Sequence, residues 1–94
     1  MKIEDLLRKR RIHPHRATDE EIQRLLQLAH RALKLARRTM AEDWDWAFSI
    51  AYNAVLQSSR AYMYSQGYRP AAEQGHKNTL AFLQAELDEE FGSL

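Results

Sequence analysis

The chain contains no cysteine, only three glycines and two prolines, and no long uninterrupted apolar run. The lack of cysteine excludes a disulfide framework and thiolate metal sites, and it fits a reducing compartment. No stretch approaches the roughly 20 apolar residues that a membrane-spanning helix needs, and residues 1–11 are basic without the apolar segment of a secretory signal. Few chain-breaking residues favour helices. We therefore expect one cytoplasmic domain over residues 1–94, without a membrane span.

The formal net charge of +1 conceals an uneven distribution. Residues 1–40 hold eleven Lys and Arg against five Asp and Glu, a balance of +6, whereas residues 41–94 hold three against eight, a balance of −5. Such a split creates local fields that the net charge does not report. The basic half could meet phosphate or an acidic partner. Alternatively, the two halves could dock on each other within a dimer.

Apolar spacing predicts a short N-terminal helix over residues 3–9, followed by a polar connector over residues 10–17. Thr18 and Glu21 have the spacing of a capping box, which predicts the start of a long helix. Leu28 and Leu35 widen the apolar stripe of this helix, so we expect it to touch more than one neighbour. The stripe itself repeats at intervals of three and four and comprises Ile22, Leu25, Leu26, Ala29, Ala32, Leu33, Ala36 and Met40.

A second long helix is predicted over residues 43–66, with Gly67 in the left-handed position that terminates it. A seam of small residues lets a facing helix approach closely, and that helix could be the preceding one or a symmetry-related copy. The bulky residues Phe48, Val55 and Tyr62 run beside the seam. The seam consists of Ala47, Ala51, Ala54, Ser58, Ala61 and Ser65.

A last helix is expected to begin between residues 70 and 76 and to bury Leu80, Leu83, Leu87 and Phe91. The sequence contains no internal repeat and no glycine-rich phosphate loop. The predicted fold is all-α: an up-down bundle of three long helices plus a short N-terminal helix.

Several motifs along the chain resemble those of HEPN domains, which are small helical bundles and usually dimeric. The resemblance covers residues 3 to about 87 and lies in the combination of motifs. They are Trp44-x-Trp46-Ala47-Phe48-Ser49-x-Ala51-Tyr52-Asn53-Ala54, Arg60-Ala61, Gly67-Tyr68-Arg69-Pro70 and Gly75-His76-Lys77.

The resemblance implies a choice of roles. Prokaryotic HEPN proteins often accompany a small nucleotidyltransferase in toxin–antitoxin pairs, and many family members are metal-independent ribonucleases with an Arg followed four to six residues later by His. Arg69 and His76 enclose six residues, but Pro70 stands where the family commonly has a polar residue. The family's Arg-Asn…His-x-Tyr motif in a later helix has no counterpart in residues 1–94. Either the protein is a shortened member that lacks this C-terminal helix, or the sequence stops early.

The bend between the last two helices gathers Tyr68, Arg69, Glu73 and His76, the one tight cluster of chemically capable side chains. A histidine can act as base and acid on a ribose hydroxyl and a leaving oxygen, and an arginine can stabilise the charged phosphorane. The structural alternative is that Arg69 caps carbonyls or pairs with Glu73, while His76 caps the last helix. At a helix N-terminus the cationic form of His76 would be disfavoured.

A row of basic side chains on the first long helix, Arg24, Arg31, Lys34 and Arg38, could contact nucleic-acid phosphates or could be a solvated surface. The aromatic residues could stack bases, but at helical spacing they are more often core or interface. His13 and His15 flank a proline without a nearby carboxylate or thiolate, so we expect no metal site and no cofactor.

These observations predict a homodimeric interaction or regulatory protein, the partner of a nucleotidyltransferase in a toxin–antitoxin-like system. The first alternative is an enzyme, a metal-independent endoribonuclease that uses Arg69 and His76. The second alternative is non-catalytic RNA binding through the row of basic side chains.

Overall fold

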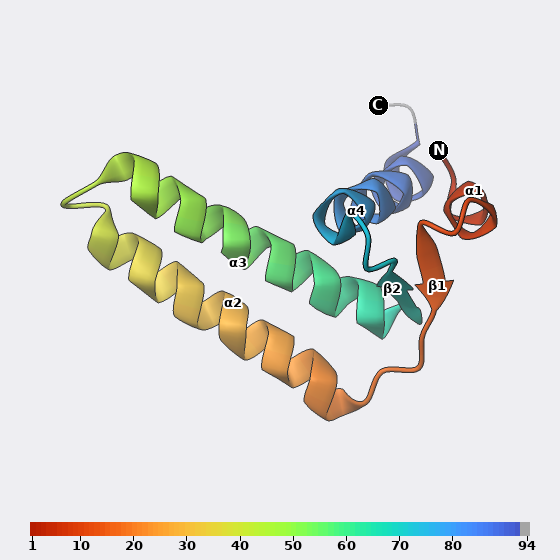
Figure 1. The fold of residues 1–94 in the computed structure, drawn as a ribbon, viewed down its shortest axis with the longest axis horizontal. Helices are drawn as coiled ribbons and strands as arrows, with labels where there is room; N and C mark the ends of the chain where they lie inside the picture. Colours follow the sequence, from red (N-terminus) through yellow and green to blue (C-terminus); the bar gives the residue numbers. More distant parts are fainter. Residues whose placement is uncertain (93–94) are drawn as a thin grey trace.

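The computed structural model describes residues 1–92 and shows a mostly helical small domain with three long helices, a short N-terminal helix and a small two-stranded sheet (Figure 1). No helix in residues 1–92 is long and apolar enough to cross a membrane. The elements in chain order are α1 (Ile3–Arg8), β1 (Ile12–Pro14), α2 (Asp19–Thr39), α3 (Trp44–Ser65), β2 (Tyr68–Pro70) and α4 (Gly75–Phe91).

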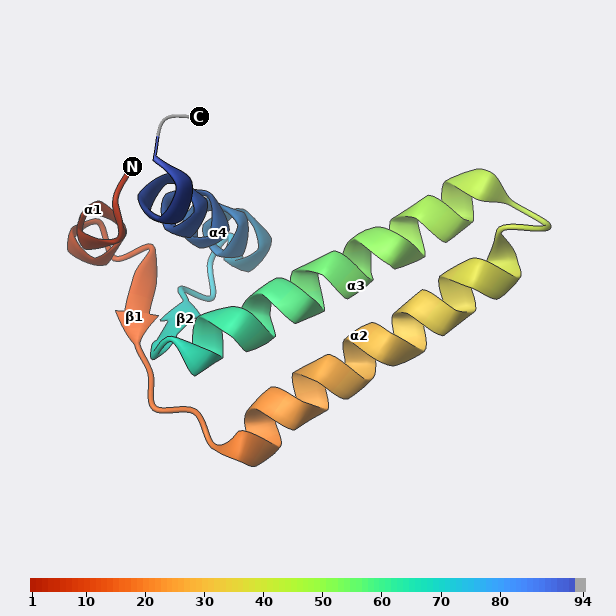
Figure 2. The same ribbon diagram turned by 180° about the vertical axis from the view of Figure 1, so that it is seen from behind.

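The two longest helices, α2 and α3, form an antiparallel hairpin that extends away from the rest of the chain (Figures 1 and 2). Their ends lie where the sequence predicts them. The Thr18 hydroxyl accepts a hydrogen bond from the Glu21 amide at 3.1 Å, and the Asp43 carboxylate accepts one from the Trp46 amide at 3.0 Å. Gly67 ends α3 with φ +93°, a conformation that favours glycine.

Part of the small-residue seam on α3 faces α2. Ala47, Ala54 and Ala61 are buried, and Ala29 and Ala36 are the buried positions of α2. Close approach of two alanine-lined helices gains dispersion contacts along their length. The preceding helix therefore accounts for the buried half of the seam, whereas Ala51 is half-buried and Ser58 and Ser65 are exposed.

The prediction of a purely α-helical chain is wrong at one point, because residues 12–14 and 68–70 pair as antiparallel strands. The expected polar connector and polar bend are thus held together, with His13 opposite Arg69. The His15 amide donates to the Gly67 carbonyl at 2.8 Å, and the Ala71 amide donates to the Arg11 carbonyl at 2.9 Å. These bonds extend the pairing at both ends of the two strands.

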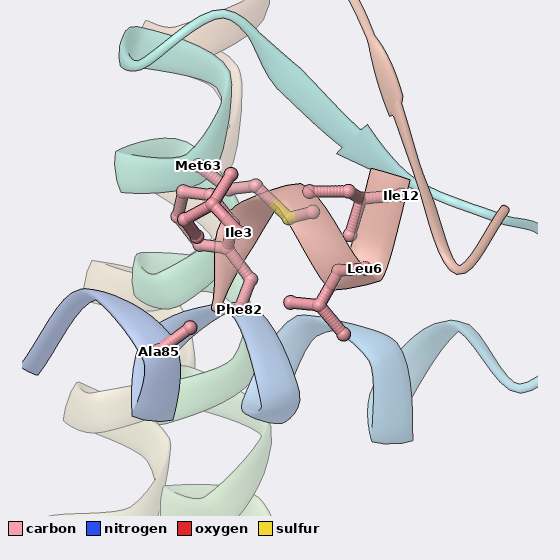
Figure 3. Packing of buried hydrophobic residues seen from close by; sticks show 6 residues of the cluster. All are labelled: Ile3, Leu6, Ile12, Met63, Phe82 and Ala85. Carbon is pink, nitrogen blue, oxygen red and sulfur yellow. The ribbon is translucent and has the colours of Figure 1, made fainter. Parts of the chain in front are cut away.

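The fully enclosed core lies at the end of the hairpin that carries α1, α4 and the sheet (Figure 3). Phe82 from α4 is its largest side chain and is almost completely buried. The remaining members come from α1, β1, α3 and α4 and are Ile3, Leu6, Ile12, Met63 and Ala85.

Helix α4 does not complete an up-down bundle with α2 and α3. It packs on α3, β2 and α1, and it is seen nearly end-on where α2 and α3 lie in the plane of the picture (Figure 1). Its buried positions are Asn78, Thr79, Phe82 and Ala85. The expected burial of Leu87 and Phe91 is wrong, since both side chains are exposed, and Leu80 and Leu83 are half-buried.

Candidate functional site

Strand β2 places Arg69 on the outward side of the small sheet. Its neighbours along the strand, Tyr68 and Pro70, point to the other side because side chains alternate in a strand. That other side is the core, where Ile12 is fully buried and the Tyr68 ring lies 5.6 Å from the Phe82 ring. Arg69 therefore shares an exposed sheet face with His13, its cross-strand partner.

His76 lies in the first turn of α4 and is exposed. It lines a shallow depression together with Arg60 and Lys77, and Arg69 is not among the lining residues. The Arg60 guanidinium reaches this helix end, since a Cβ at Gly75 would lie 3.5 Å from Arg60 Nη2. The structure thus gathers His76 with Arg60 rather than with Arg69, a neighbourhood that the sequence spacing did not reveal.

The other two residues of the bend, Tyr68 and Glu73, take part in packing and in a backbone hydrogen bond. Tyr68 is half-buried against Phe82, so its ring is not free to stack on a base. Glu73 is exposed, and its backbone carbonyl accepts a hydrogen bond from Asn78 Nδ2 at 3.0 Å. Within residues 1–92 the close contacts between basic and acidic side chains are Arg8–Asp5 and His15–Glu21, so the pairing of Arg69 with Glu73, one of the structural alternatives, is not formed.

His15 ties the sheet to the start of α2. Its Nε2 atom lies 3.2 Å from Glu21 Oε2, and its ring lies 4.8 Å from the Tyr64 ring. The hydrogen bond from His15, followed by that from the Thr18 backbone amide, lowers the pKa of the Glu21 carboxyl. Residues 1–92 hold no group of three side chains that could bind a metal ion.

The row of basic side chains lies on the side of α2 that points away from α3. All four members are exposed, and none forms an ion pair within the part of the chain that the structure describes. At about 100° per residue they occupy one sector of the helix. They are Arg24, Arg31, Lys34 and Arg38.

The α2–α3 hairpin exposes large apolar side chains on two sides. Leu33 and Leu35 are 44% and 45% exposed and lie about 200° apart around α2. We call one side the apolar face and the other the mixed face. The apolar face comprises Leu26, His30, Leu33, Ala51, Val55 and Ser58, which line one groove, together with the adjoining Trp44, Phe48 and Tyr62. The mixed face is lined by Leu28, Arg31, Ala32, Leu35, Trp46, Ser49, Ile50, Asn53 and Gln57.

Comparisons with models of protein families, with curated proteins and with solved structures found no match to this chain.

Proposed function

We propose that this protein is a non-catalytic interaction module whose α2–α3 hairpin docks a partner protein. The observation that carries the proposal is the exposure of large apolar side chains on both sides of the hairpin, including Leu33 and Leu35. Monomeric soluble proteins rarely expose large contiguous apolar patches, and such patches usually mark binding surfaces. Because the hairpin has two such surfaces, we expect it to bind two partners.

The mixed face is the docking site for a partner protein that differs from this chain. Trp46 is 62% exposed there and lines the same groove as Arg31, and these two residue types dominate the binding energy of many interfaces. Ser49, Asn53 and Gln57 supply the polar groups typical of interfaces that form and dissociate. The matching partner surface is an apolar ridge with acidic residues at its edge, because the row of basic side chains borders this face.

The resemblance to HEPN domains supplies the expected identity of that partner, a nucleotidyltransferase in a toxin–antitoxin-like pair. The motif at residues 44–54 that carries the resemblance lies at the start of α3, and the Gly67 motif follows the end of that helix. Cytoplasmic localisation remains part of this proposal.

The test is affinity purification of the tagged chain from its native lysate, with identification of the proteins that remain bound. Recovery of a nucleotidyltransferase with the wild type and with Trp44→Ala, but not with Trp46→Ala, would support the proposal. Trp44 is the matched control because it is an exposed tryptophan on the other side of the same helix. Recovery of no nucleotidyltransferase, or equal recovery with both variants, would contradict it.

Non-catalytic RNA binding is the second candidate, favoured by the row of basic side chains on α2, which forms no ion pair within residues 1–92. Binding that neutralises several phosphates weakens steeply as salt rises, because condensed counterions are released. We expect the affinity for single-stranded RNA to fall with salt concentration, and to fall less steeply in the double variant Arg31→Gln, Arg38→Gln. An affinity that does not change with salt would end this idea.

The ribonuclease alternative receives less support from the geometry. Arg69 lies on the outward face of the sheet and His76 lies beside Arg60, so the two assigned catalytic residues do not share a depression.

A further inference from the structure

We propose that the mixed face binds one amphipathic α-helix of the partner protein. The apolar side of that helix lies along the groove between α2 and α3, and its acidic residues face the arginines of α2. This inference rests on the proposed function and deepens it, because it states the shape and the charge of the segment that the partner presents.

The lining of the mixed face repeats at the interval that a neighbouring helix requires. A seven-residue repeat keeps a constant side toward a helix that runs nearly parallel or antiparallel, at about 20°. An extended strand alternates every two residues and does not match such a surface. The lining residues that lie seven positions apart are Leu28 and Leu35 on α2, and Trp46 and Asn53, and Ile50 and Gln57, on α3. The groove therefore fits a third helix that runs along the hairpin.

The middle of the groove is apolar and uncovered. Leu28 and Leu35 are 38% and 45% exposed, and Ala32 and Ile50 are half-buried beside them. Within residues 1–92, α4 packs on α3, β2 and α1 at one end of the hairpin and leaves the length of α2 open (Figures 1 and 2). Leucines of a partner helix would cover these side chains as knobs fill holes in a coiled coil. The homodimer expected from the sequence would not compete for this groove, because a second copy is better suited to the apolar face, whose groove no Lys, Arg, Asp or Glu lines.

The α2 edge of the groove determines the charge of the helix that binds there. Arg24, Arg31 and Arg38 recur every seven positions and form a column about 40° around α2 from the column of Leu28 and Leu35. All three arginines are exposed and form no ion pair within residues 1–92, and no Asp or Glu lines the groove. Charged residues that flank an apolar seam pair with opposite charges on the facing helix. The partner helix therefore carries Asp or Glu at seven-residue intervals, about 10.5 Å apart, on the side that lies over α2.

The α3 edge of the groove is polar but uncharged where it lines the groove, with Ser49, Asn53 and Gln57. The opposite flank of the partner helix is therefore expected to carry amides or hydroxyls rather than charges. The column from Arg24 to Arg38 spans about 21 Å of α2, so a helix of about 14 residues covers the groove.

The leucines of the groove favour a helix over RNA, the second candidate ligand of the same arginines. RNA binding depends on cations for the phosphates and, in single strands, on aromatic rings for the bases. Leu28 and Leu35 lie directly beside the arginine column and supply neither. An acidic helix with an apolar side uses the arginines and the leucines together.

The test uses two stapled helical peptides without tryptophan, each about 18 residues long so that it covers the groove. Both peptides have leucines on one side; one has glutamate at every seventh position along a flank of that side, and the other has lysine there. Binding is measured from the emission of Trp46 in the Trp44→Phe variant, where it is the only tryptophan. We expect a micromolar Kd and a shift to shorter wavelength with the glutamate peptide, and binding at least about tenfold weaker with the lysine peptide.

Charge reversal on α2 supplies the matched control. In the Trp44→Phe background, Arg31→Glu should lower the affinity for the glutamate peptide by about tenfold and raise the affinity for the lysine peptide. Arg37→Glu makes the same change at an exposed arginine about 120° around α2 from Arg31 that does not line the mixed face, and it should leave both affinities unchanged. Circular dichroism spectra of both variants separate lost binding from lost folding.

Equal affinities for the two peptides, or equal effects of Arg31→Glu and Arg37→Glu, would overturn the inference. A single-stranded RNA that changes the emission of Trp46 while neither peptide binds would also overturn it and would assign the groove to RNA. The proposed function is tested separately, because the lysate experiment identifies the retained protein whereas the peptides report the chemistry of the groove. If the glutamate peptide is preferred but no nucleotidyltransferase is recovered, the inference is supported and the expected identity of the partner is wrong. If a nucleotidyltransferase is retained through Trp46 while the two peptides bind equally, the reverse holds.

Discussion

Replacing Ala54 by leucine tests the packing of the hairpin itself. Ala54 is 6% exposed in the small-residue seam between α3 and α2, and leucine adds three carbon atoms there. If space existed, burial of those atoms would stabilise the fold by about 2 kcal/mol. Ala54 borders the groove of the apolar face, but its methyl group is almost enclosed, so a branched side chain at this position must strain its neighbours or separate the helices. Such overpacking typically costs about 1–3 kcal/mol.

In a domain of this size, that loss corresponds to a fall in Tm of about 4 to 24 °C. The assay is thermal unfolding by circular dichroism, with Asn53→Leu as the control because it introduces the same residue at the adjacent, exposed position. A surface change of this kind should alter the free energy of unfolding by less than about 0.5 kcal/mol. An Ala54→Leu variant with the Tm of the wild type would refute the seam as a tight intramolecular contact.

Three further outcomes follow from the structure. In denaturant unfolding, Gly67→Ala should lower the free energy of unfolding by about 1–2 kcal/mol, because alanine is strained at a φ of +93°. A steric clash adds nothing, since a Cβ there would meet no atom closer than 4.0 Å, and Gly67→Asn should lower the free energy of unfolding by less. Phe82→Ala, at the centre of the enclosed core, should lower the free energy of unfolding by about 3–5 kcal/mol, and a decrease of less than about 1 kcal/mol would contradict the assignment of that core. In EDTA, the wild type, Arg69→Ala and His76→Ala should all leave RNA uncleaved; cleavage by the wild type that disappears in both variants would establish the enzyme instead.

The ends of the long helices could be predicted because their signals are local. The Thr18–Glu21 box, Asp43 and Gly67 each act within about one helical turn, so the sequence alone identifies them. The small sheet could not be predicted in this way. Its strands have three residues each, contain a proline each and lie more than 50 residues apart, so neither shows an alternating pattern. The isolated Ile12 in a basic segment, now fully buried, was the one available hint.

The buried side of α4 depends on partners that spacing cannot show. Asn78 is buried because Arg11 Nε donates to its Oδ1 at 2.9 Å and because its Nδ2 donates to the Glu73 carbonyl. The Thr79 hydroxyl donates to the Gly75 carbonyl at 2.8 Å. Polar groups with such bonds can be buried at little cost. Of the leucines that the apolar pattern favoured, Leu80 and Leu83 are therefore only half-buried, and Leu87 is exposed.

The candidate site was predicted only in part. The row of basic side chains on α2 follows from helical spacing and is confirmed as an exposed surface. The proximity of His76 to Arg60 depends on how α4 crosses α3, a tertiary feature without a local signal. The apolar face was visible as bulky residues beside the seam, but its exposure follows only from the direction that α4 takes.

The two native tryptophans allow the most direct test of the claim that the hairpin has two faces with different partners. Trp44 belongs to the apolar face and Trp46 to the mixed face, and the chain contains no other tryptophan. The measurement is the emission maximum on dilution, recorded for Trp46→Phe, which reports Trp44, and for Trp44→Phe, which reports Trp46. We predict that the emission maximum of Trp44 shifts to longer wavelength as dimers dissociate, while the emission maximum of Trp46 stays constant. A shift of Trp46 alone, or of neither, would contradict the account.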